Sequence, residues 1–374
     1  MNIAFFCIPA HGHTNPTLAV VRELTARGHT VRYYTTEAFR AKVETAGAVF
    51  VPFDAEAARP GMTAADGARL GSDLAFSTKL IVDLTLAADD WLSRELTAHR
   101  PDVIAGDSMA FWAKLAAKKH GIPFVSSTTT FAFNRFSAKV IEQNGAGFLQ
   151  FLLAQPRINR QLKRLRAAGY AVKSVFDIIA NDNETETVVY TSPDFQPCAD
   201  TFSEKYHFVG PLLRPAQSSF EKLPGRSLIY ISLGTVNNDA LPFYRACLAA
   251  FGGDPRFQLV LSAGTQTDLA AFGPIPESCT VRASVDQMAV LDCADVFLTH
   301  CGMNSASEGL WHGLPLVLYP QTPEQHGVAN RVAALGAGVP LTDPSADGIR
   351  RAVEAALTDP AYRENAQKLA DGFR

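Results

Sequence analysis

The chain has 374 residues, 47% of them hydrophobic, with a formal net charge of −3 and a pI near 6.3. This length exceeds one ordinary hydrophobic core and predicts two domains. The small negative charge and the lack of a basic stripe in the sequence argue against nucleic acid and anionic membranes as partners. No apolar run approaches the roughly 18 residues of a membrane-spanning helix. The six cysteines contain no Cys-x-x-Cys pair, which argues against both a zinc site and a disulfide framework.

The N-terminus leads directly into a strand-like apolar run at residues 3–8, without a cationic leader. We therefore expect no secretory signal and a cytoplasmic protein. The loop Pro9-Ala10-His11-Gly12-His13 follows this strand, and Pro16 is expected to begin the first helix.

Short apolar strands alternate with helical patterns through the first half, which predicts βαβ units and a parallel sheet. After the first strand, further strands are predicted at 31–34, 49–53, 102–105 and 123–125. The helix after 102–105 is expected to turn Trp112 and Leu115 inward and Lys114, Lys118 and Lys119 outward. Residues 131–179 are less regular and rich in aromatic side chains.

A stretch rich in Pro, Ser and Gln interrupts this alternation and is predicted to be a linker over 212–226. The alternation then restarts, with strands expected at 228–233, 258–261, 295–299 and 315–319. We predict a first domain over 1–211 and a second over 227–374. Both are expected to be Rossmann-like α/β domains.

The segment 299–308, Thr-His-Cys-Gly-Met-Asn-Ser-Ala-Ser-Glu, lies between a buried strand and a helical pattern. A turn of small residues there presents backbone N–H groups and a helix N-terminus to an anion, and a phosphate is the natural guest. Asn304 and Ser305 add short hydrogen-bonding side chains. Glu308 follows about one helical turn later and suits a diol such as ribose. The pattern indicates a nucleotide site.

This segment, followed about sixteen residues later by Glu324-Gln325, resembles the donor signature of the GT1 glycosyltransferases. Residues 9–16 resemble the segment of that family that carries the catalytic histidine. The resemblance covers nearly the whole chain and is greatest to bacterial macrolide and polyphenol glycosyltransferases. It implies the GT-B architecture, in which two Rossmann-like domains face each other across a cleft. In that architecture the first domain, 1–211, is expected to bind the acceptor, and the second, 227–374, the nucleotide sugar.

His13 is the predicted catalytic base, because a neutral imidazole at the carboxyl edge of the sheet can take a proton from an acceptor hydroxyl. His11 lies in the same loop, so spacing alone does not choose between the two histidines. The remaining alternative is a loop histidine whose sole role is to cap the helix. The resemblance aligns the base with His13. It also pairs this histidine with Asp107, although the residue pattern alone favours Asp107 as a helix N-cap. Asp102 lies at the wrong end of the strand.

The resemblance also implies a set of donor contacts for a UDP-sugar. The diphosphate is expected at His300, Gly302, Asn304 and Ser305 and at the Ser232, Gly234 and Thr235 turn. Glu308 is assigned to the ribose, which favours UDP over dTDP. Glu324 and Gln325 are assigned to the sugar hydroxyls, and Gln at the second position is associated with glucose. Val285 and Gln287 are expected beside the base, where Ser284 replaces the stacking aromatic residue of the family and Asp286 is expected to cap the next helix.

The expected reaction is an inverting transfer, without a metal or a cofactor, from a UDP-sugar to a hydroxyl of a small lipophilic acceptor. Four aromatic residues are candidates for the acceptor pocket and equally for the core: Phe76, Trp112, Phe131 and Phe133. Three alternative functions stay open: a GT-B-shaped epimerase or hydrolase, a non-catalytic nucleotide-sugar-binding helper, and a nicotinamide oxidoreductase. The Gly-x-Gly-x-x-Gly turn that an oxidoreductase would carry after the first strand is missing from this sequence. The sequence names neither the acceptor nor the oligomeric state. Since family members commonly continue with a further C-terminal helix, the resemblance also implies a shortened chain.

Overall fold

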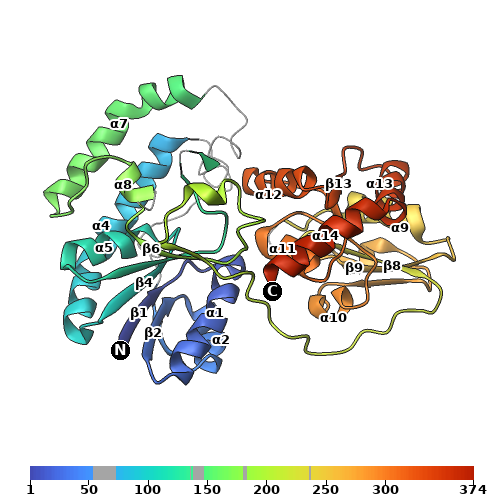
Figure 1. Ribbon diagram of the computed structural model, residues 1–374, viewed down its shortest axis with the longest axis horizontal. Helices are drawn as coiled ribbons and strands as arrows, with labels where there is room; N and C mark the ends of the chain where they lie inside the picture. Colours follow the sequence, from blue (N-terminus) through green and yellow to red (C-terminus); the bar gives the residue numbers. More distant parts are fainter. Residues whose placement is uncertain (54–72, 135, 138–146, 180–182, 236) are drawn as a thin grey trace. The chain divides into compact units, whose positions relative to one another are not determined.

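The chain divides into two compact units in this computed structural model, which describes residues 1–374 except 54–72, 135, 138–146, 180–182 and 236 (Figure 1). The first unit comprises residues 1–190 and 196–212, and the second comprises 191–195 and 213–374. The domain bounds expected from the sequence, 1–211 and 227–374, stay a prediction.

The first unit is built on a seven-stranded parallel sheet with the order β3-β2-β1-β4-β5-β6-β7. The strands are β1 (Asn2–Phe6), β2 (Thr30–Thr35), β3 (Val49–Pro52), β4 (Val103–Asp107), β5 (Phe124–Thr128), β6 (Glu186–Val189) and β7 (Tyr206–Phe208). The helices are α1 (His11–Ala26), α2 (Arg40–Thr45), α4 (Leu74–His99), α5 (Phe111–His120), α7 (Gly147–Ala167) and α8 (Phe176–Ile179), with the 3₁₀ turns Glu37–Phe39 and Ala199–Thr201.

Both faces of this sheet are covered, which explains why its strands are continuously apolar rather than alternating. Successive side chains of a strand point to opposite faces. Phe6 and Tyr34 therefore join the core under α4 and α5, while Phe5 and Tyr33 join the core under α1 and α2 (Figure 1). Each of these four rings is at most 2% exposed.

The first helix begins earlier than predicted, at His11 instead of Pro16. The N–H groups of His13 and Thr14 both donate to the Ala10 carbonyl and close the first turn ahead of the proline. Pro16 then removes only one hydrogen bond from the helix. As a result, His13 lies in the first turn of α1 rather than in a loop before it.

The second unit contains a six-stranded parallel sheet with the order β10-β9-β8-β11-β12-β13. Its strands are β8 (Ser227–Ser232), β9 (Phe257–Ser262), β10 (Cys279–Arg282), β11 (Val296–Thr299), β12 (Leu316–Leu318) and β13 (Gly338–Pro340). The helices are α9 (Leu241–Phe251), α10 (Gln287–Leu291), α11 (Met303–Trp311), α12 (Pro323–Ala334), α13 (Ala346–Thr358) and α14 (Pro360–Phe373), with a 3₁₀ turn at Leu269–Phe272. A buried apolar cluster joins α9 and α13 to the sheet.

The strand order of each sheet reverses beside its first strand. The chain moves outward from β1 to β3 and then returns to place β4 on the other side of β1, and β8 and β11 have the same relation in the second unit. Such a reversal leaves a crevice beyond the carboxyl ends of the two central strands, where open α/β sheets bind ligands. The predicted base, His13, follows β1, and its carboxylate partner, Asp107, is the last residue of β4. The predicted diphosphate residues lie at the ends of β8 and β11 and in the turns that follow.

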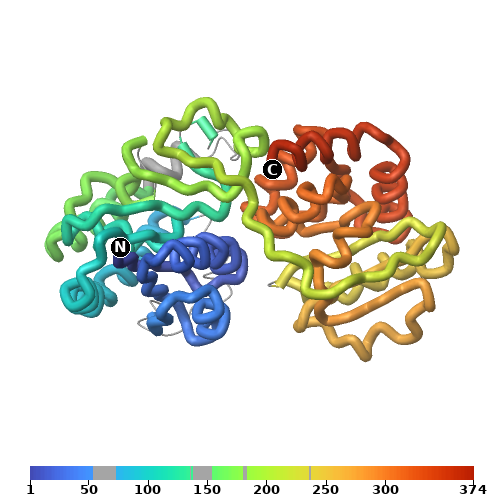
Figure 2. The backbone as a smooth tube through the Cα atoms, turned by 60° about the horizontal axis from the view of Figure 1, so that its bottom comes forward, coloured from blue at the N-terminus to red at the C-terminus, as the bar shows by residue number. Residues whose placement is uncertain are grey.

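The predicted linker runs along the second unit (Figure 2). The Asp286 carboxylate accepts hydrogen bonds from the N–H groups of Gln217 and Ser218, at 2.6 and 2.8 Å. Asp286 stands at the N-cap position of α10 but makes no side-chain capping bond there, so the predicted capping role is wrong. Its carboxylate holds the linker instead.

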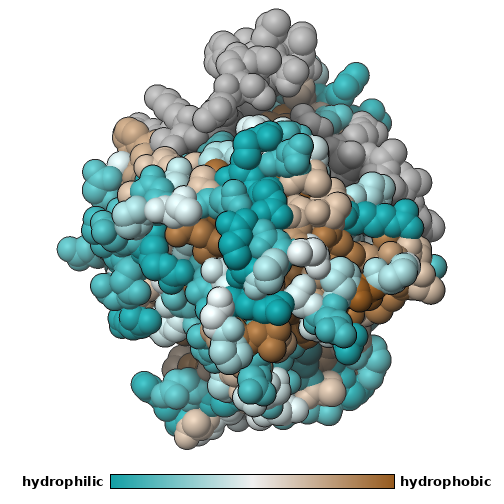
Figure 3. All heavy atoms as spheres, turned by 90° about the vertical axis from the view of Figure 1, so that its right-hand side faces the viewer, coloured by the Kyte–Doolittle hydropathy of each residue, from teal (hydrophilic) through white to brown (hydrophobic). Residues whose placement is uncertain are grey.

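Within the described part of the chain, no helix has the length and apolar character needed to cross a membrane. Hydrophilic side chains are spread over the face in Figure 3, and apolar residues appear there in several separate places.

Asn238 holds the turn after β8, where three predicted donor residues lie. Its side-chain amide donates to the Gly234 carbonyl at 3.0 Å and accepts from the Gln266 N–H at 3.1 Å, and the residue is 1% exposed. We expect Asn238→Ala to lower the free energy of unfolding by about 1 to 3 kcal/mol, because buried backbone groups lose their partners.

Urea unfolding checks this, with Asn237→Ala as the matched control, since Asn237 is the exposed neighbouring residue. The control should change the free energy of unfolding by less than about 0.5 kcal/mol. Equal midpoints for the two variants would contradict this role of Asn238.

Candidate active site

His13 and Asp107 meet at the carboxyl edge of the first sheet. The Nδ1 atom of His13 lies 2.7 Å from Oδ2 of Asp107, and the two side chains are 16% and 0% exposed. A carboxylate that accepts from Nδ1–H selects the tautomer whose Nε2 is a base, and it stabilises the imidazolium once that base takes a proton. This geometry suits general-base chemistry on a hydroxyl group.

Asp107 faces His13, and it is not the helix N-cap that the residue pattern alone favoured. Its Oδ1 accepts from the Met109 N–H at 2.8 Å, which holds the turn before α5, while its Oδ2 faces His13. The N-cap position of α5 is Ala110. Asp102 lies at the opposite end of β4, where its carboxylate accepts from the Asn2 N–H at 2.7 Å.

His11 has different surroundings. It is exposed, its ring lies edge-on to Phe39 with centroids 5.0 Å apart, and its Nδ1 is 3.4 Å from Nζ of Lys42. Burial and the Lys42 charge both lower its pKa. The structure therefore brings the aspartate to His13 and a cation to His11, a distinction that spacing alone did not make.

Thr129 was missed from the sequence. Its hydroxyl lies 2.9 Å from Nδ1 of His13, the same nitrogen that faces Asp107, and the residue is 2% exposed. The available signal was the polar run Ser126-Ser127-Thr128-Thr129-Thr130 at the end of the strand next to β4. With two oxygens around Nδ1, the ring is oriented from two sides.

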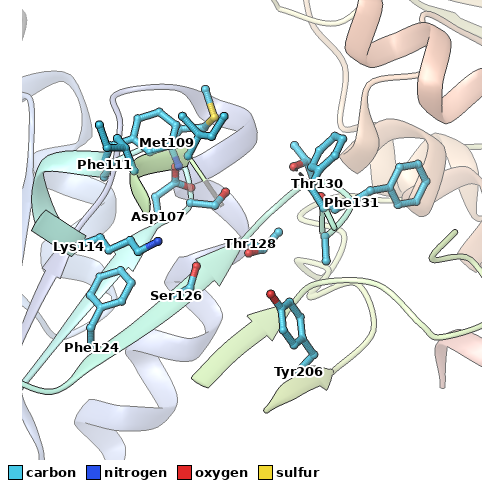
Figure 4. A pocket seen from close by; sticks show the side chains of 16 residues that line it. Asp107, Met109, Phe111, Lys114, Phe124, Ser126, Thr128, Thr130, Phe131 and Tyr206 are labelled. Carbon is cyan, nitrogen blue, oxygen red and sulfur yellow. Dashed lines mark hydrogen bonds between the residues drawn. The ribbon is translucent and has the colours of Figure 1, made fainter. Parts of the chain in front are cut away.

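A pocket begins beside Asp107 on the first unit (Figure 4). The pocket is open to solvent on one side, and its volume, counted with that open part, is about 640 Å³. Of the four predicted acceptor residues, Phe131 and Phe133 line it, with 4% and 48% of their surfaces exposed. Trp112 lies elsewhere, in the core against Phe53, and Phe76 is half-buried in the first turn of α4 and does not line the pocket.

In the second unit, three predicted donor residues, Ser232, Gly234 and Gly302, lie around the ring of a fourth, His300. Ser232 pairs with Thr299 across the parallel strands, so the turns after β8 and β11 are neighbours. A Cβ on either Gly234 or Gly302 would come within 2.6 Å of the His300 ring, and Gly234 has φ +79°. Both positions therefore require glycine for the ring to fit.

The His300 ring is buried and neutral. Its Nδ1 has no hydrogen-bond partner among the described residues, and burial lowers its pKa to about 4. A neutral ring with an unsatisfied nitrogen is suited to hydrogen bonding with a ligand at this edge.

The N-terminus of α11 follows directly. Gly302 is its N-cap and provides no side-chain capping bond, and Asn304 and Ser305 lie in the first turn. Both residues are half-buried. A helix N-terminus without a side-chain cap favours an anion through its backbone N–H groups and the helix dipole. Thr235, in the opposite turn, is exposed.

Glu308 belongs to a chain of hydrogen bonds that crosses the sheet face. Tyr230 donates to the Gln287 side-chain oxygen at 2.9 Å, and the Gln287 amide donates to the Glu308 carboxylate. Burial raises the pKa of Glu308. The structure thus joins two predicted donor residues, Gln287 and Glu308. Just before Gln287 in the chain, Val285 is half-buried and Ser284 is exposed.

Gln325 has a structural role at the start of α12. Thr322 and Gln325 form a capping box, in which the Gln325 side-chain oxygen accepts from the N–H groups of Gln321 and Thr322 at 2.8 and 3.2 Å. Its side-chain NH₂ group remains as a donor for a ligand. Glu324 is exposed.

Among the described residues, no three His, Cys, Asp or Glu side chains gather in a way that could hold a metal ion.

Known proteins match this chain over nearly its whole length. It is 33% identical to the NDP-glycosyltransferase YjiC of Bacillus licheniformis, over 98% of this chain and 92% of that protein. It is 32% identical to the demethyllactenocin mycarosyltransferase of Streptomyces fradiae, over 100% of this chain and 83% of that protein. Residues 257–373 match the family described as erythromycin biosynthesis protein CIII-like, C-terminal domain.

The chain belongs to the GT1 family of glycosyltransferases. The crystal structure of the glycotransferase of kitacinnamycin matches with a TM-score of 0.85 and 30% identity, over 100% of this chain and 94% of that one. The predicted family, the α/β GT-B fold class and the enzyme class are therefore confirmed. This GT1 enzyme is a glycosyltransferase of the macrolide and natural-product type that uses nucleotide sugars.

Thr129→Val should lower kcat of this GT1 enzyme about tenfold, because a hydroxyl that orients the His13 ring is lost. Thr129→Ser should restore most of kcat, and the affinity for the nucleotide should not change in either variant. Steady-state kinetics and calorimetry of nucleotide binding measure the two quantities. A valine variant with wild-type kcat would show that Asp107 orients His13 alone.

His300 should make stability depend on pH. Its folded pKa of about 4 lies below its ordinary value of 6.5, so the unfolded chain takes up the proton first. The stabilisation from a neutral His300 is then complete above pH 6.5 and is lost as the pH falls toward 4, with a slope of up to about 1.4 kcal/mol per pH unit.

Thermal unfolding at several pH values, for wild type and His300→Asn, tests this expectation. The melting temperature of wild type should fall more steeply than that of His300→Asn as the pH is lowered through this window. Parallel pH profiles would contradict it.

Proposed function

We propose that this enzyme transfers a hexose, with glucose as the first candidate, from a UDP-sugar to a hydroxyl of a small lipophilic acceptor such as a phenol, a flavonoid or a macrolide. The reaction inverts the anomeric centre, needs no metal and gives a β-O-glycoside. The observation that carries the proposal is the 2.7 Å contact between Nδ1 of His13 and the buried Asp107 carboxylate.

In this mechanism His13 is the general base. Its Nε2 removes the proton from the acceptor hydroxyl while the oxygen attacks C1 of an α-linked donor from the face opposite the diphosphate. The C1–O bond to UDP breaks with its electron pair on the leaving phosphate, and the proton stays on His13 until it passes to solvent. Asp107 stabilises the imidazolium that forms.

The second unit stabilises the charge that develops on UDP. The first turn of α11, which has no side-chain cap, and the neutral His300 ring offer hydrogen bonds and a helix dipole to the diphosphate. The His300 ring is held close to the backbone of the two turns, because Gly234 and Gly302 carry no Cβ there. This is electrostatic catalysis by the protein alone.

The nucleoside and the sugar are assigned to the remaining donor residues. The Glu308 side chain, held by Gln287, is proposed to bind the ribose hydroxyls, and Val285 to contact the base through its backbone. The NH₂ group of Gln325 and the exposed Glu324 carboxylate are proposed to bind the sugar hydroxyls. A relative is named as a mycarosyltransferase, so donors that carry sugars other than glucose are to be compared with UDP-glucose.

UDP release from UDP-glucose, with and without a panel of phenols and macrolides and with EDTA present, tests the proposal. Wild type should release UDP only when an acceptor is present. His13→Ala should lower the rate by about 10² to 10⁴-fold, the usual contribution of a general base. His11→Ala is the matched control and should keep the wild-type rate.

Three results would contradict parts of the proposal. Release without an acceptor would indicate a hydrolase, and a rate abolished by EDTA would indicate a required metal. Tight UDP binding without turnover of any acceptor from any donor would indicate a non-catalytic role.

A further inference from the structure

Arg214 stands at the start of the linker, beside residues assigned to the nucleoside. Its Nη2 atom lies 3.7 Å from Oδ1 of Asp286, the residue before Gln287. The linker is fixed at this point, because Oδ2 of Asp286 accepts hydrogen bonds from the N–H groups of Gln217 and Ser218. Arg214 is therefore held on the second unit where the linker passes α10 (Figure 1).

The positive charge of Arg214 reaches the hydrogen-bond chain that joins β8 to α11. Burial raises the pKa of Glu308, and both the Gln287 amide and the Arg214 charge act against this rise. The same charge acts against the rise that burial causes in the pKa of Tyr230. Because Coulomb interactions weaken with distance, a cation that acts on both residues lies on their side of the sheet edge. Arg214 thus borders the position assigned to the ribose and the base.

The flat faces of the Arg214 guanidinium are open to a ligand. Within the described part of the chain, its contact with Asp286 is an ion pair longer than a hydrogen bond, and Oδ1 of Asp286 has no hydrogen-bond partner. The Arg214 side chain is 45% exposed, whereas that of Asp286 is 14% exposed. The N–H donors of a guanidinium point outward in its own plane, so a contact at their edge leaves its faces accessible.

The loop after β10 carries no aromatic side chain. Residues 283–287, from the end of β10 to the first residue of α10, read Ala-Ser-Val-Asp-Gln. A pyrimidine base is a flat aromatic ring, and a guanidinium group stacks on such rings through planar contact and cation–π attraction. The diphosphate is assigned to the turns after β8 and β11, whereas Asp286 follows β10, which β9 separates from β8. This position favours the base over the phosphates as the partner of Arg214.

We propose that Arg214 determines donor specificity by stacking its guanidinium group on the pyrimidine base of the nucleotide sugar, with Asp286 as its positioning residue. The inference rests on the proposed function, because it needs a nucleotide donor on the second unit. The base is far from the reacting carbon in any nucleotide sugar and keeps its contacts throughout the reaction. A change at Arg214 should therefore appear in KM for the donor and not in kcat.

The test compares calorimetric binding of UDP and dihydrouridine diphosphate. Dihydrouracil keeps both carbonyl groups and the ring N–H group of uracil but is neither aromatic nor flat. Wild type should bind UDP about fivefold more tightly than the dihydro compound. Arg214→Met should bring the two affinities close to each other. Arg214→Lys keeps the charge without the planar face, so it should recover only a small part of the preference.

Arg282→Met is the matched control. Arg282 is an exposed arginine at the end of β10, so this change removes the same charge from the same edge of the sheet. It should keep the full preference for UDP. Binding of inorganic pyrophosphate separates the base from the phosphates, and Arg214→Met should weaken it no more than Arg282→Met does.

The inference is overturned if wild type binds the two nucleotides equally, or if Arg214→Met or Arg214→Lys keeps the full preference. A specific loss of pyrophosphate binding in Arg214→Met also overturns it, since Arg214 would then bind phosphate. If sugar transfer proceeds in any of these cases, the inference fails alone. If UDP binds with the expected preference but no sugar is transferred, the proposed function fails alone. Absent binding of both UDP and dTDP by wild type overturns both.

Discussion

The parallel pairing of the central strands is the constraint on which both sites depend. When all strands of a sheet run the same way, their carboxyl ends and the turns that follow them meet at one edge. β1 and β4 bring His13 and Asp107 together in this way, although they are 94 residues apart. β8 and β11 do the same for Gly234 and His300. Both sheet faces are covered by helices, which leaves this edge as the natural place for ligands.

Asp107 connects the chemistry to the local fold. One carboxylate oxygen orients the base and the other holds the turn that leads into α5, so the same residue places the histidine and the first wall of the pocket. Such a carboxylate is nearly inaccessible to water, at 1% exposed, and its hydrogen bonds offset the cost of burying it. Catalytic geometry and pocket shape are therefore coupled through one side chain.

The donor side follows a different principle, because its key groups belong to the backbone or are neutral. The first turn of α11 and the His300 ring present partial charges rather than full ones. They suit a diphosphate whose charge increases as the sugar departs, since they need not reorganise during the reaction. The bond between Gln287 and Glu308 extends this arrangement toward the position assigned to the nucleoside.

The sequence by itself determined the family, the two α/β halves and the positions of the main motifs, because these depend on local patterns: apolar runs, small-residue turns and helix starts. It missed the short strands β6, β7, β10 and β13, whose three or four residues carry little periodicity. Spacing alone did not choose between His13 and His11, and the tertiary structure brings His13 to Asp107, as the resemblance implied. Only the tertiary structure decided that Thr129 lies on the same nitrogen and that Lys114 lines a pocket. Each of these outcomes depends on which distant element packs against a residue, and packing between elements far apart in the chain is not encoded in any local spacing.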